Sequence, residues 1–350
     1  METPGGASTR NYSGWGDVPS GDDPMSNTET DPAEVVCAAT AGAAARVEVL
    51  EPRDVPLGGP RAMTVRRTLP QRGRSMVGAW CFADHYGPDD VSATGGMDVA
   101  PHPHTGLQTV SWLFSGEIEH RDSLGVHAVV RPGELNLMTG GHGICHSEVS
   151  LPGTTVLHGV QLWVALPDAH RDAPRDFQHH RPEPIALPGA TVRVFLGTLA
   201  GHTSPVRTFT PLLGAELVLE PGVGVELAVD PRHEHGVLVD QGEVELSGVR
   251  VRRAELGCTA PGAGTLTLAN PGPQPARAML LGGEPFGEEI VMWWNFVARD
   301  HDEIAHHRAE WQAGTERFGQ VTGYPGARLP APPLPTGRLR PRSNPPLPPR

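Results

Sequence analysis

Two short histidine motifs carry the clearest chemical signal in the chain. His102 and His104 stand two residues apart, and further along the chain His146 and Glu148 repeat that spacing. On an extended strand, residues i and i+2 point to the same face. Two such strands side by side would bring three imidazole nitrogens and one carboxylate oxygen together. This donor set suits one divalent transition metal; it favours Fe(II), while Mn, Ni, Cu and Zn remain compatible by geometry.

Four neighbouring or similar residues are weaker candidates for ligands. His142 lies among glycines, so we expect a loop residue beside the site and not a fifth ligand. Cys145 alternates with the histidine that follows it, which predicts a small, buried, apolar side chain on the opposite face. His233 and His235 form a second His-x-His pair, but no His/Glu pair follows them in the second half. A complete second site is therefore not expected.

Short strands are the elements that must position these residues. Gly (43) and Pro (37) are frequent, and Pro-Gly pairs separate many short apolar stretches, which is typical of tight turns between strands. Many short strands and few helical patterns predict an all-β sandwich or barrel. The candidate strands cover residues 45–50, 108–114, 126–130, 156–166, 191–196, 217–229, 237–246, 265–268 and, as a buried strand with two Trp, 290–297.

An internal repeat favours two barrels over one large sheet. The stretch Ser-Gly-Glu-Ile-Glu-His at residues 115–120 is similar to Gln-Gly-Glu-Val-Glu-Leu at residues 241–246. Each stretch follows an apolar strand that is itself preceded by a His-x-His pair. Such similarity at matching positions indicates a duplicated unit.

One short helix is predicted near the C-terminus. Asp300 followed by Glu303 forms a capping-box-like start, with Asp in place of the usual Ser or Thr. Ile304 and Trp311 lie seven residues apart and so share one helix face. Gly314 is a suitable end, because glycine readily adopts the left-handed conformation.

Composition excludes several classes of protein. The net charge is −12 and the chain has no lysine, whereas a general nucleic-acid binder needs clustered basic residues. The four cysteines lie far apart without a CxxC pair, which argues against a disulfide framework or a thiolate zinc site. We find no apolar stretch of membrane-spanning length and no signal peptide, so we expect a cytoplasmic protein. We also expect it to be a monomer.

Longer motifs around the histidines resemble the pirin family of the cupin superfamily. The resemblance covers roughly residues 45–322 and lies in the segments 69–88, 101–106 (PHPHTG), 132–148 (PGELNLMTGGHGICHSE) and 283–285. It implies a mainly β fold of two tandem cupin barrels, a bicupin, with metal in the N-terminal barrel only. It also implies that the metal ligands are His102, His104, His146 and Glu148.

The resemblance and the composition together suggest a division of the chain. We expect a disordered N-terminal arm at residues 1–40, a metal-binding cupin domain at 41–175 and a cupin domain without metal at 176–322. Residues 323–350 are dominated by Pro and Arg, which predicts a disordered, polyproline-like tail.

Two positions depart from the family pattern. Gln108 occupies a place where the wider cupin pattern has Glu, so it can form hydrogen bonds but cannot act as a carboxylate base. His142 occupies a place where many relatives have an Arg-like residue. Both changes would alter contacts to a substrate or an anion without changing the ligands.

The resemblance leaves the activity open between three hypotheses. The first is an Fe(II)-dependent quercetin 2,3-dioxygenase, with a small aromatic flavonol as substrate and Glu148 as both ligand and catalytic base. The second is a metal-dependent regulatory or redox-sensing protein that acts through a protein partner. The third is a degenerate cupin whose metal is only structural.

Overall fold

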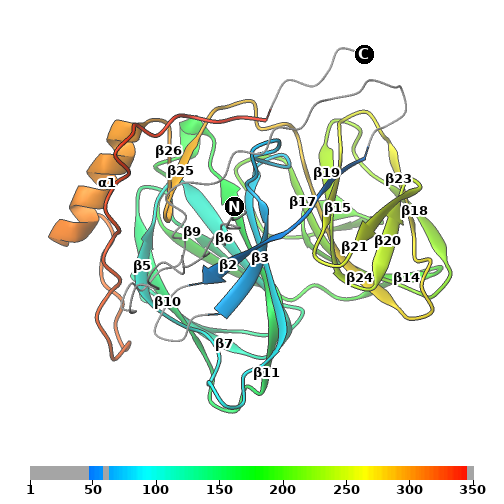
Figure 1. Ribbon diagram of the computed structural model, residues 1–350, viewed down its shortest axis with the longest axis horizontal. Helices are drawn as coiled ribbons and strands as arrows, with labels where there is room; N and C mark the ends of the chain where they lie inside the picture. Colours follow the sequence, from blue (N-terminus) through cyan, green and yellow to red (C-terminus); the bar gives the residue numbers. More distant parts are fainter. Residues whose placement is uncertain (1–46, 58–62, 345–350) are drawn as a thin grey trace, which may run out of the picture.

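Two β-barrels lie side by side in the computed structural model, which describes residues 47–57 and 63–344 (Figure 1). Each barrel combines a seven-stranded sheet with a four-stranded sheet, and all pairs are antiparallel apart from two isolated bridges. The predicted mainly β class with two tandem cupin-type barrels and one C-terminal helix is confirmed. The predicted disordered arm at residues 1–40 lies outside the described residues.

The first barrel contains both histidine motifs. Its larger sheet has the order β12-β9-β6-β11-β4-β3-β2 and its smaller sheet the order β5-β10-β7-β8. The strands are β2 (Arg53–Leu57), β3 (Met63–Leu69), β4 (Trp80–Asp90), β5 (Asp98–His104), β6 (Leu107–Ser115), β7 (Ile118–Asp122), β8 (His127–Val130), β9 (Leu135–Thr139), β10 (Ile144–Ser150), β11 (Val156–Ala165) and β12 (Asp176–His180), with a 3-10 turn η1 (Asp168–His170) before β12.

The second barrel repeats this plan. Its sheets have the orders β1-β22-β19-β24-β17-β14-β13 and β18-β23-β20-β21. The strands are β1 (Glu48–Leu50), β13 (Ile185–Leu187), β14 (Ala190–Leu196), β17 (Leu212–Leu219), β18 (Gly224–Ala228), β19 (Glu234–Gln241), β20 (Glu243–Leu246), β21 (Val249–Arg252), β22 (Leu256–Thr259), β23 (Thr265–Ala269) and β24 (Ala276–Gly283), with a separate hairpin of β15 (Thr198–Leu199) and β16 (His202–Thr203).

The repeated hexapeptides occupy equivalent places in the two barrels. The first joins β6 to β7 through Gly116, and the second joins β19 to β20 through Gly242. Both glycines have positive φ angles, 86° and 74°, a conformation that side chains with a Cβ disfavour. In each barrel the hexapeptide therefore forms the corner between the larger and the smaller sheet. This equivalence supports the duplication.

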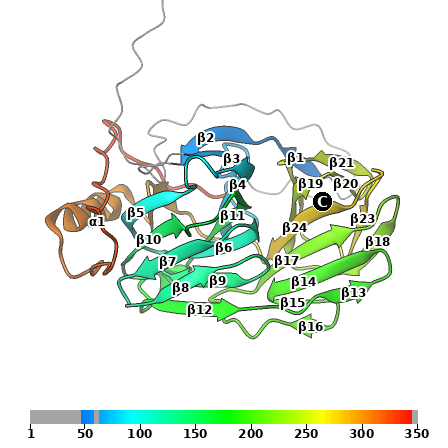
Figure 2. The same ribbon diagram turned by 90° about the horizontal axis from the view of Figure 1, so that it is seen from below.

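The two ends of the described chain are exchanged between the barrels. Strand β1 precedes the first barrel in sequence but pairs with β22 of the second (Figure 2). Conversely, β25 (Val291–Trp293), β26 (Phe296–Ala298) and α1 (His301–Ala313) follow the second barrel in sequence and pack against the first. The proposed boundaries at residues 41–175 and 176–322 therefore do not describe which segments pack together.

The predicted helix is confirmed at both ends. The side chain of Asp300 accepts a hydrogen bond from the backbone N–H of Glu303, and Gly314 ends the helix with φ 69°. Ile304 and Trp311 are its buried residues. The single strand predicted over residues 290–297 is instead the hairpin β25–β26, because Trp294 adopts a positive φ of 53° at the turn.

The segment after α1 differs from the predicted disordered tail over the residues that the structure describes. In residues 323–344, Leu329 and Ala331 are buried, and the N–H of Leu329 donates to the carbonyl of Pro101 beside the metal motif. Asn344 bonds the backbone N–H groups of Ser75 and Met76. Prolines suit this extended route, since such a segment needs no ladder of hydrogen bonds.

A shared apolar core joins the barrels. Trp80 and Trp112 of the first barrel and Phe195 and Met279 of the second belong to one buried cluster. At the same interface Gly78 and Gly283 bring their backbones together, with no room for a Cβ. Within the described residues, no helix has the length and apolar character that crossing a bilayer requires.

Candidate metal centre

The two histidine motifs lie on neighbouring antiparallel strands of the smaller sheet. Strand β5 carries His102 and His104, β10 carries His146, and the register places His146 directly opposite His102. The Nε2 atoms of His104 and His146 are 3.0 Å apart, and ligand atoms of all three histidines lie within 4.8 Å of one another. The structure therefore brings the predicted triad together in the interior of the barrel.

Hydrogen bonds on the far side of two rings leave Nε2 available for a metal. The Nδ1–H of His102 donates to the backbone carbonyl of Ala100 at 2.9 Å. His120 donates from Nε2 to Asp122 at 3.1 Å and accepts at Nδ1 from the Nδ1–H of His146, at 3.3 Å. Such partners fix the tautomer and orientation of metal-binding histidines.

Burial keeps the triad in its ligand form. Desolvation lowers the pKa of His102 to about 4 and lowers the pKa values of His104 and His146 well below the usual range. All three imidazoles are therefore neutral at pH 7 and carry the lone pairs that a metal needs.

Glu148 is buried beside the triad but is not part of its tight group. Its carboxyl accepts a hydrogen bond from the Ser111 hydroxyl at 3.2 Å and lines the same cavity as the three histidines. Burial raises the pKa of Glu148. A buried carboxyl beside three neutral imidazoles needs positive charge to remain ionised, and a divalent metal would provide it. The donor set thus fits the metal that the sequence predicts, with Glu148 as an untested fourth ligand.

Aromatic and apolar side chains form the rest of the cavity. Phe82 and Trp163 stack with ring centroids 4.0 Å apart, and Trp163 meets His104 edge-on. Met97, Val99 and Leu57 complete the apolar part. Asp84 also lines the cavity, but the guanidinium of Arg67 pairs with both of its oxygens, at 2.7 and 2.8 Å. The cavity has a volume of about 30 Å³, which accommodates an ion and a water molecule.

The other predicted positions lie where the patterns place them. Gln108 is buried and donates to the hydroxyl of Thr139, outside the cavity lining. His142 lies in the loop before β10, half-buried, with Nδ1 near the carbonyl of Ala173. Cys145 faces the apolar core, and burial raises the pKa of its thiol to about 11. Glu234, between His233 and His235, bonds the backbone of Gly78 instead of facing a metal.

Sequence reasoning missed two groups of functional interest. His120 and Asp122 support the triad from β7; in the sequence His120 stood out only as the last residue of the repeated hexapeptide, which ends before Asp122. A second buried cluster joins His85, His158 and Asp240 across the two barrels. Its members come from segments far apart in the sequence, so no local motif could indicate it.

Two facing barrels with one buried histidine triad in the first define a bicupin suited to bind a metal in its N-terminal half. The chain matches the family model Pirin over residues 62–164 and the model Pirin C-terminal cupin domain over residues 214–319. The chain therefore belongs to the pirin family.

Relatives with similar sequences carry two kinds of name. A protein of Pseudomonas aeruginosa named "Putative quercetin 2,3-dioxygenase" is 46% identical, over 81% of this chain and 89% of its own length. A "Pirin-like protein" of Caulobacter vibrioides is 38% identical, over 71% of this chain and 88% of its own. Among solved structures, a quercetin 2,3-dioxygenase from Acinetobacter baumannii is 37% identical with a TM-score of 0.79, covering 84% of this chain and 97% of that chain.

Proposed function

We propose that this pirin is an Fe(II)-dependent dioxygenase acting on a flavonol-type aromatic substrate, with His102, His104, His146 and Glu148 holding the metal. The observation that carries the proposal is the buried triad of neutral imidazoles beside a carboxyl and a stacked aromatic pair. The names of the similar proteins from Pseudomonas aeruginosa and Acinetobacter baumannii agree with this reaction class.

Iron bound at the triad would supply the Lewis acidity and the one-electron chemistry with dioxygen that side chains lack. The protein would supply the proton acceptor for the flavonol 3-hydroxyl, because the carboxylate of Glu148 lies in the same cavity as the triad and a bound metal would set its pKa. Ser111 orients this carboxylate through its hydroxyl. The Phe82–Trp163 pair offers a face against which a flavonol ring would stack.

Substrate entry requires the lining to move. A cavity of about 30 Å³ is far smaller than the roughly 300 Å³ or more of a typical small-molecule site. Met97 and Leu57 are the most adaptable apolar side chains of the lining, since the others are aromatic or, in Val99, β-branched and stiff. We therefore expect a flavonol to displace one or both of them when it binds.

Turnover of quercetin by metal-loaded protein tests the proposal. Elemental analysis of protein from its own host first identifies the metal, and aerobic incubation of that sample with quercetin should then bleach the flavonol absorbance. His104→Ala removes one imidazole from the triad, so it should lose both the metal and the bleaching, whereas His202→Ala, at an exposed histidine of the second barrel, should retain both. Bleaching no faster than that caused by the same concentration of free iron would contradict the dioxygenase assignment.

The small cavity favours a second candidate, a metal-dependent regulatory protein without a substrate of its own. In that case the metal would act on the surface that a protein partner recognises. We then expect metal-replete protein not to turn over quercetin. We also expect it to bind one protein partner, and both chelation of the metal and His104→Ala should abolish that binding. Partner binding that survives both treatments would contradict this candidate.

A further inference from the structure

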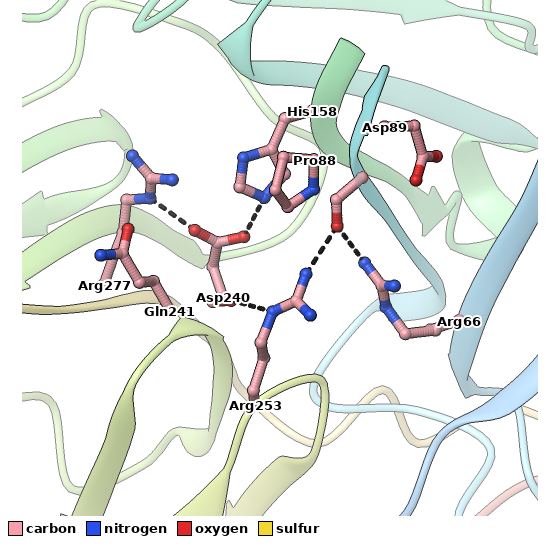
Figure 3. A pocket seen from close by; sticks show the side chains of 9 residues that line it. Arg66, Pro88, Asp89, His158, Asp240, Gln241, Arg253 and Arg277 are labelled. Carbon is pink, nitrogen blue, oxygen red and sulfur yellow. Dashed lines mark hydrogen bonds and ion pairs between the residues drawn. The ribbon is translucent and has the colours of Figure 1, made fainter. Parts of the chain in front are cut away.

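A basic cavity of about 300 Å³ lies between the two barrels, away from the histidine triad (Figure 3). The first barrel contributes the end of β4 and parts of β3 and β11, and the second contributes β19, β24 and the turn after β21. The lining residues are Arg66, Gly87, Pro88, Asp89, His158, Asp240, Gln241, Arg253 and Arg277. The volume is at the lower end of the range for sites that bind small organic ligands.

Two arginines from different barrels meet at one backbone carbonyl. Arg253 donates to the carbonyl of Gly87 at 2.7 Å, and Arg66 donates to the same oxygen from the other side (Figure 3). In residues 47–57 and 63–344, neither guanidinium forms an ion pair with a carboxylate within 4.0 Å. Burial and repulsion by Arg253 lower the pKa of Arg66, while Asp89, Asp54 and Asp240 act in the opposite direction. The lining holds three arginines against the two carboxylates of Asp89 and Asp240, so the cavity keeps a net positive charge.

The central carboxylate of the cavity is already saturated. Asp240 is fully buried and accepts from Arg277 at one oxygen, at 2.6 Å. At its other oxygen it meets His85 at 2.7 Å and also His158. Arg277 is further held over the ring of Phe114, 4.1 Å from the ring centroid. Asp240 therefore orders the basic groups around the cavity without cancelling the charge of Arg66 and Arg253.

The hydrogen bonds argue against a second metal at this cluster. Burial lowers the pKa of His85, so its ring is neutral and carries one hydrogen. Arg66 Nε donates to His85 Nδ1 at 3.3 Å, which places that hydrogen on Nε2, where it donates to Asp240. Both ring nitrogens of His85 are then occupied. Three guanidiniums around the cavity would also repel a divalent cation.

We propose that this cavity binds a phosphate group, as inorganic phosphate or as a small phosphate monoester, between Arg66 of the first barrel and Arg253 and Arg277 of the second. Guanidinium groups match the geometry of phosphate oxygens and form charge-assisted hydrogen bonds to them. Each of the three arginines has NH₂ groups beyond those used in the bonds above. A bound phosphate would contact both barrels at once and hold them together.

Calorimetric titration of the full-length protein tests this site, with inorganic phosphate and glycerol phosphate as separate ligands at constant ionic strength. We expect one saturable site per chain. Arg253→Gln and Arg66→Gln should each weaken binding at least about tenfold, because each removes one charge-assisted contact. The control Arg250→Gln changes an exposed arginine on neighbouring β21 and should leave binding unchanged. Tighter binding of glycerol phosphate than of inorganic phosphate would identify the monoester as the ligand.

Thermal melting without added anion checks that each variant is folded. Because Arg253 is exposed, we expect Arg253→Gln to fold as the wild type does. Absence of saturable binding for both phosphates would overturn the proposal, as would equal binding by wild type and Arg253→Gln. A stoichiometric metal that binds in the His104→Ala background and is lost on adding His158→Gln would also overturn it. None of these measurements depends on dioxygenase activity.

Discussion

The ring of His146 is held by two successive hydrogen bonds that end on a buried carboxylate. Asp122 fixes His120, and His120 fixes His146, so the Nε2 lone pair of His146 is directed toward the other two histidines. Buried ring nitrogens need partners whether or not the ring binds a ligand. Partners of this kind also orient metal-binding histidines, so His120 and Asp122, which stand beside His146 but outside the cavity lining, would influence the affinity for a metal.

His120→Phe should weaken metal binding without removing a ligand. The ring and its contact with Phe177 are retained, but the acceptor for the Nδ1–H of His146 is lost. We expect the dissociation constant for Ni(II) or Zn(II), measured by competition with a chelating dye, to rise by roughly 10- to 100-fold. His127→Phe, on the exposed strand β8, is the matched control. An unchanged constant in His120→Phe would show that the hydrogen bond does not support the site.

His235 should make the stability of the protein depend on pH. Its ring is fully buried, neither nitrogen has a partner among the described residues, and burial lowers its pKa to about 4. As the pH falls through about 6.5, His235 therefore takes up a proton in the unfolded chain but stays neutral in the folded chain. Stability is complete above about pH 6.5 and falls toward pH 4, by up to about 3 kcal/mol from this residue.

Urea unfolding of chelator-treated protein between pH 7.5 and pH 5 checks this effect. In His235→Leu the free energy of unfolding should fall less steeply with decreasing pH than in wild type. His202→Ala, which changes an exposed histidine, should leave the slope unchanged. Identical slopes in His235→Leu and wild type would contradict the assignment.

The triad was predictable from sequence because its geometry is local. The spacing of His102 and His104 fixes a shared face once the strand is extended, and His146 needs only an adjacent strand. His120 was not predictable in the same way, since its partner lies across a sheet register that no motif specifies. The basic cavity was not predictable either, because its residues come together only through contacts between the two barrels, and local sequence patterns do not indicate such contacts.

At the scale of elements, caps and turns decide where regular structure begins and ends. The side chain of Asp300 satisfies the N–H of Glu303, and the carboxylate of Glu303 accepts from the N–H of Arg299. This reciprocal pair starts α1 in the direction that lets Trp311 reach the first barrel and donate to the carbonyl of Leu329.

Asp300→Ala should destabilise the protein by about 1 kcal/mol, because it leaves a helical N–H without its acceptor. Asp302→Ala is the control, since Asp302 lies in the same turn but is exposed and forms an ion pair with Arg338, which is itself exposed. Chemical denaturation of both variants measures the difference. An equal loss of stability in the two variants would show that charge in the first turn, and not the cap, is responsible.

Strand positions were largely predictable, while their ends were not. The stretch 237–246 shows one apolar pattern, yet the chain divides into β19 and β20 where Gly242 takes a positive φ. Residues 290–297 likewise divide into two strands at Trp294, and tryptophan is not a residue type that predicts a turn. The alternation of apolar and polar residues predicts which face of the sheet a side chain points to. The position of a corner between two strands depends on a single backbone angle, which this alternation does not indicate.

At the scale of the whole molecule, two glycines set the distance between the barrels. A Cβ on Gly78 would lie 2.6 Å from the Cα of Gly283, and Gly78 also has a φ of 53°. Beside them Trp80 donates to the carbonyls of Leu213 and Gly282, both at 3.2 Å. The barrels are therefore joined by backbone contact as well as by apolar packing.

Gly78→Ala should destabilise the protein by about 2–4 kcal/mol, through steric overlap between the barrels and an unfavourable φ. Gly222→Ala has a φ of 67°, in the same left-handed region, but nothing within 4 Å of the new Cβ, so it measures the conformational part alone. Urea unfolding followed by tryptophan fluorescence compares the two. A loss in Gly78→Ala no greater than that in Gly222→Ala would contradict the role of the close approach.

The exchange of chain ends could not be inferred from sequence, because β1 and β22 are distant and each is only a few residues long. It also imposes an order on biosynthesis. A ribosome releases the barrel that carries the histidine triad long before β25, β26, α1 and the segment that bonds Pro101 beside His102. The nascent first barrel therefore lacks this cover until residues 291–331 have been synthesised, which leaves an interval in which a metal would reach the strand that carries His102 and His104 more easily.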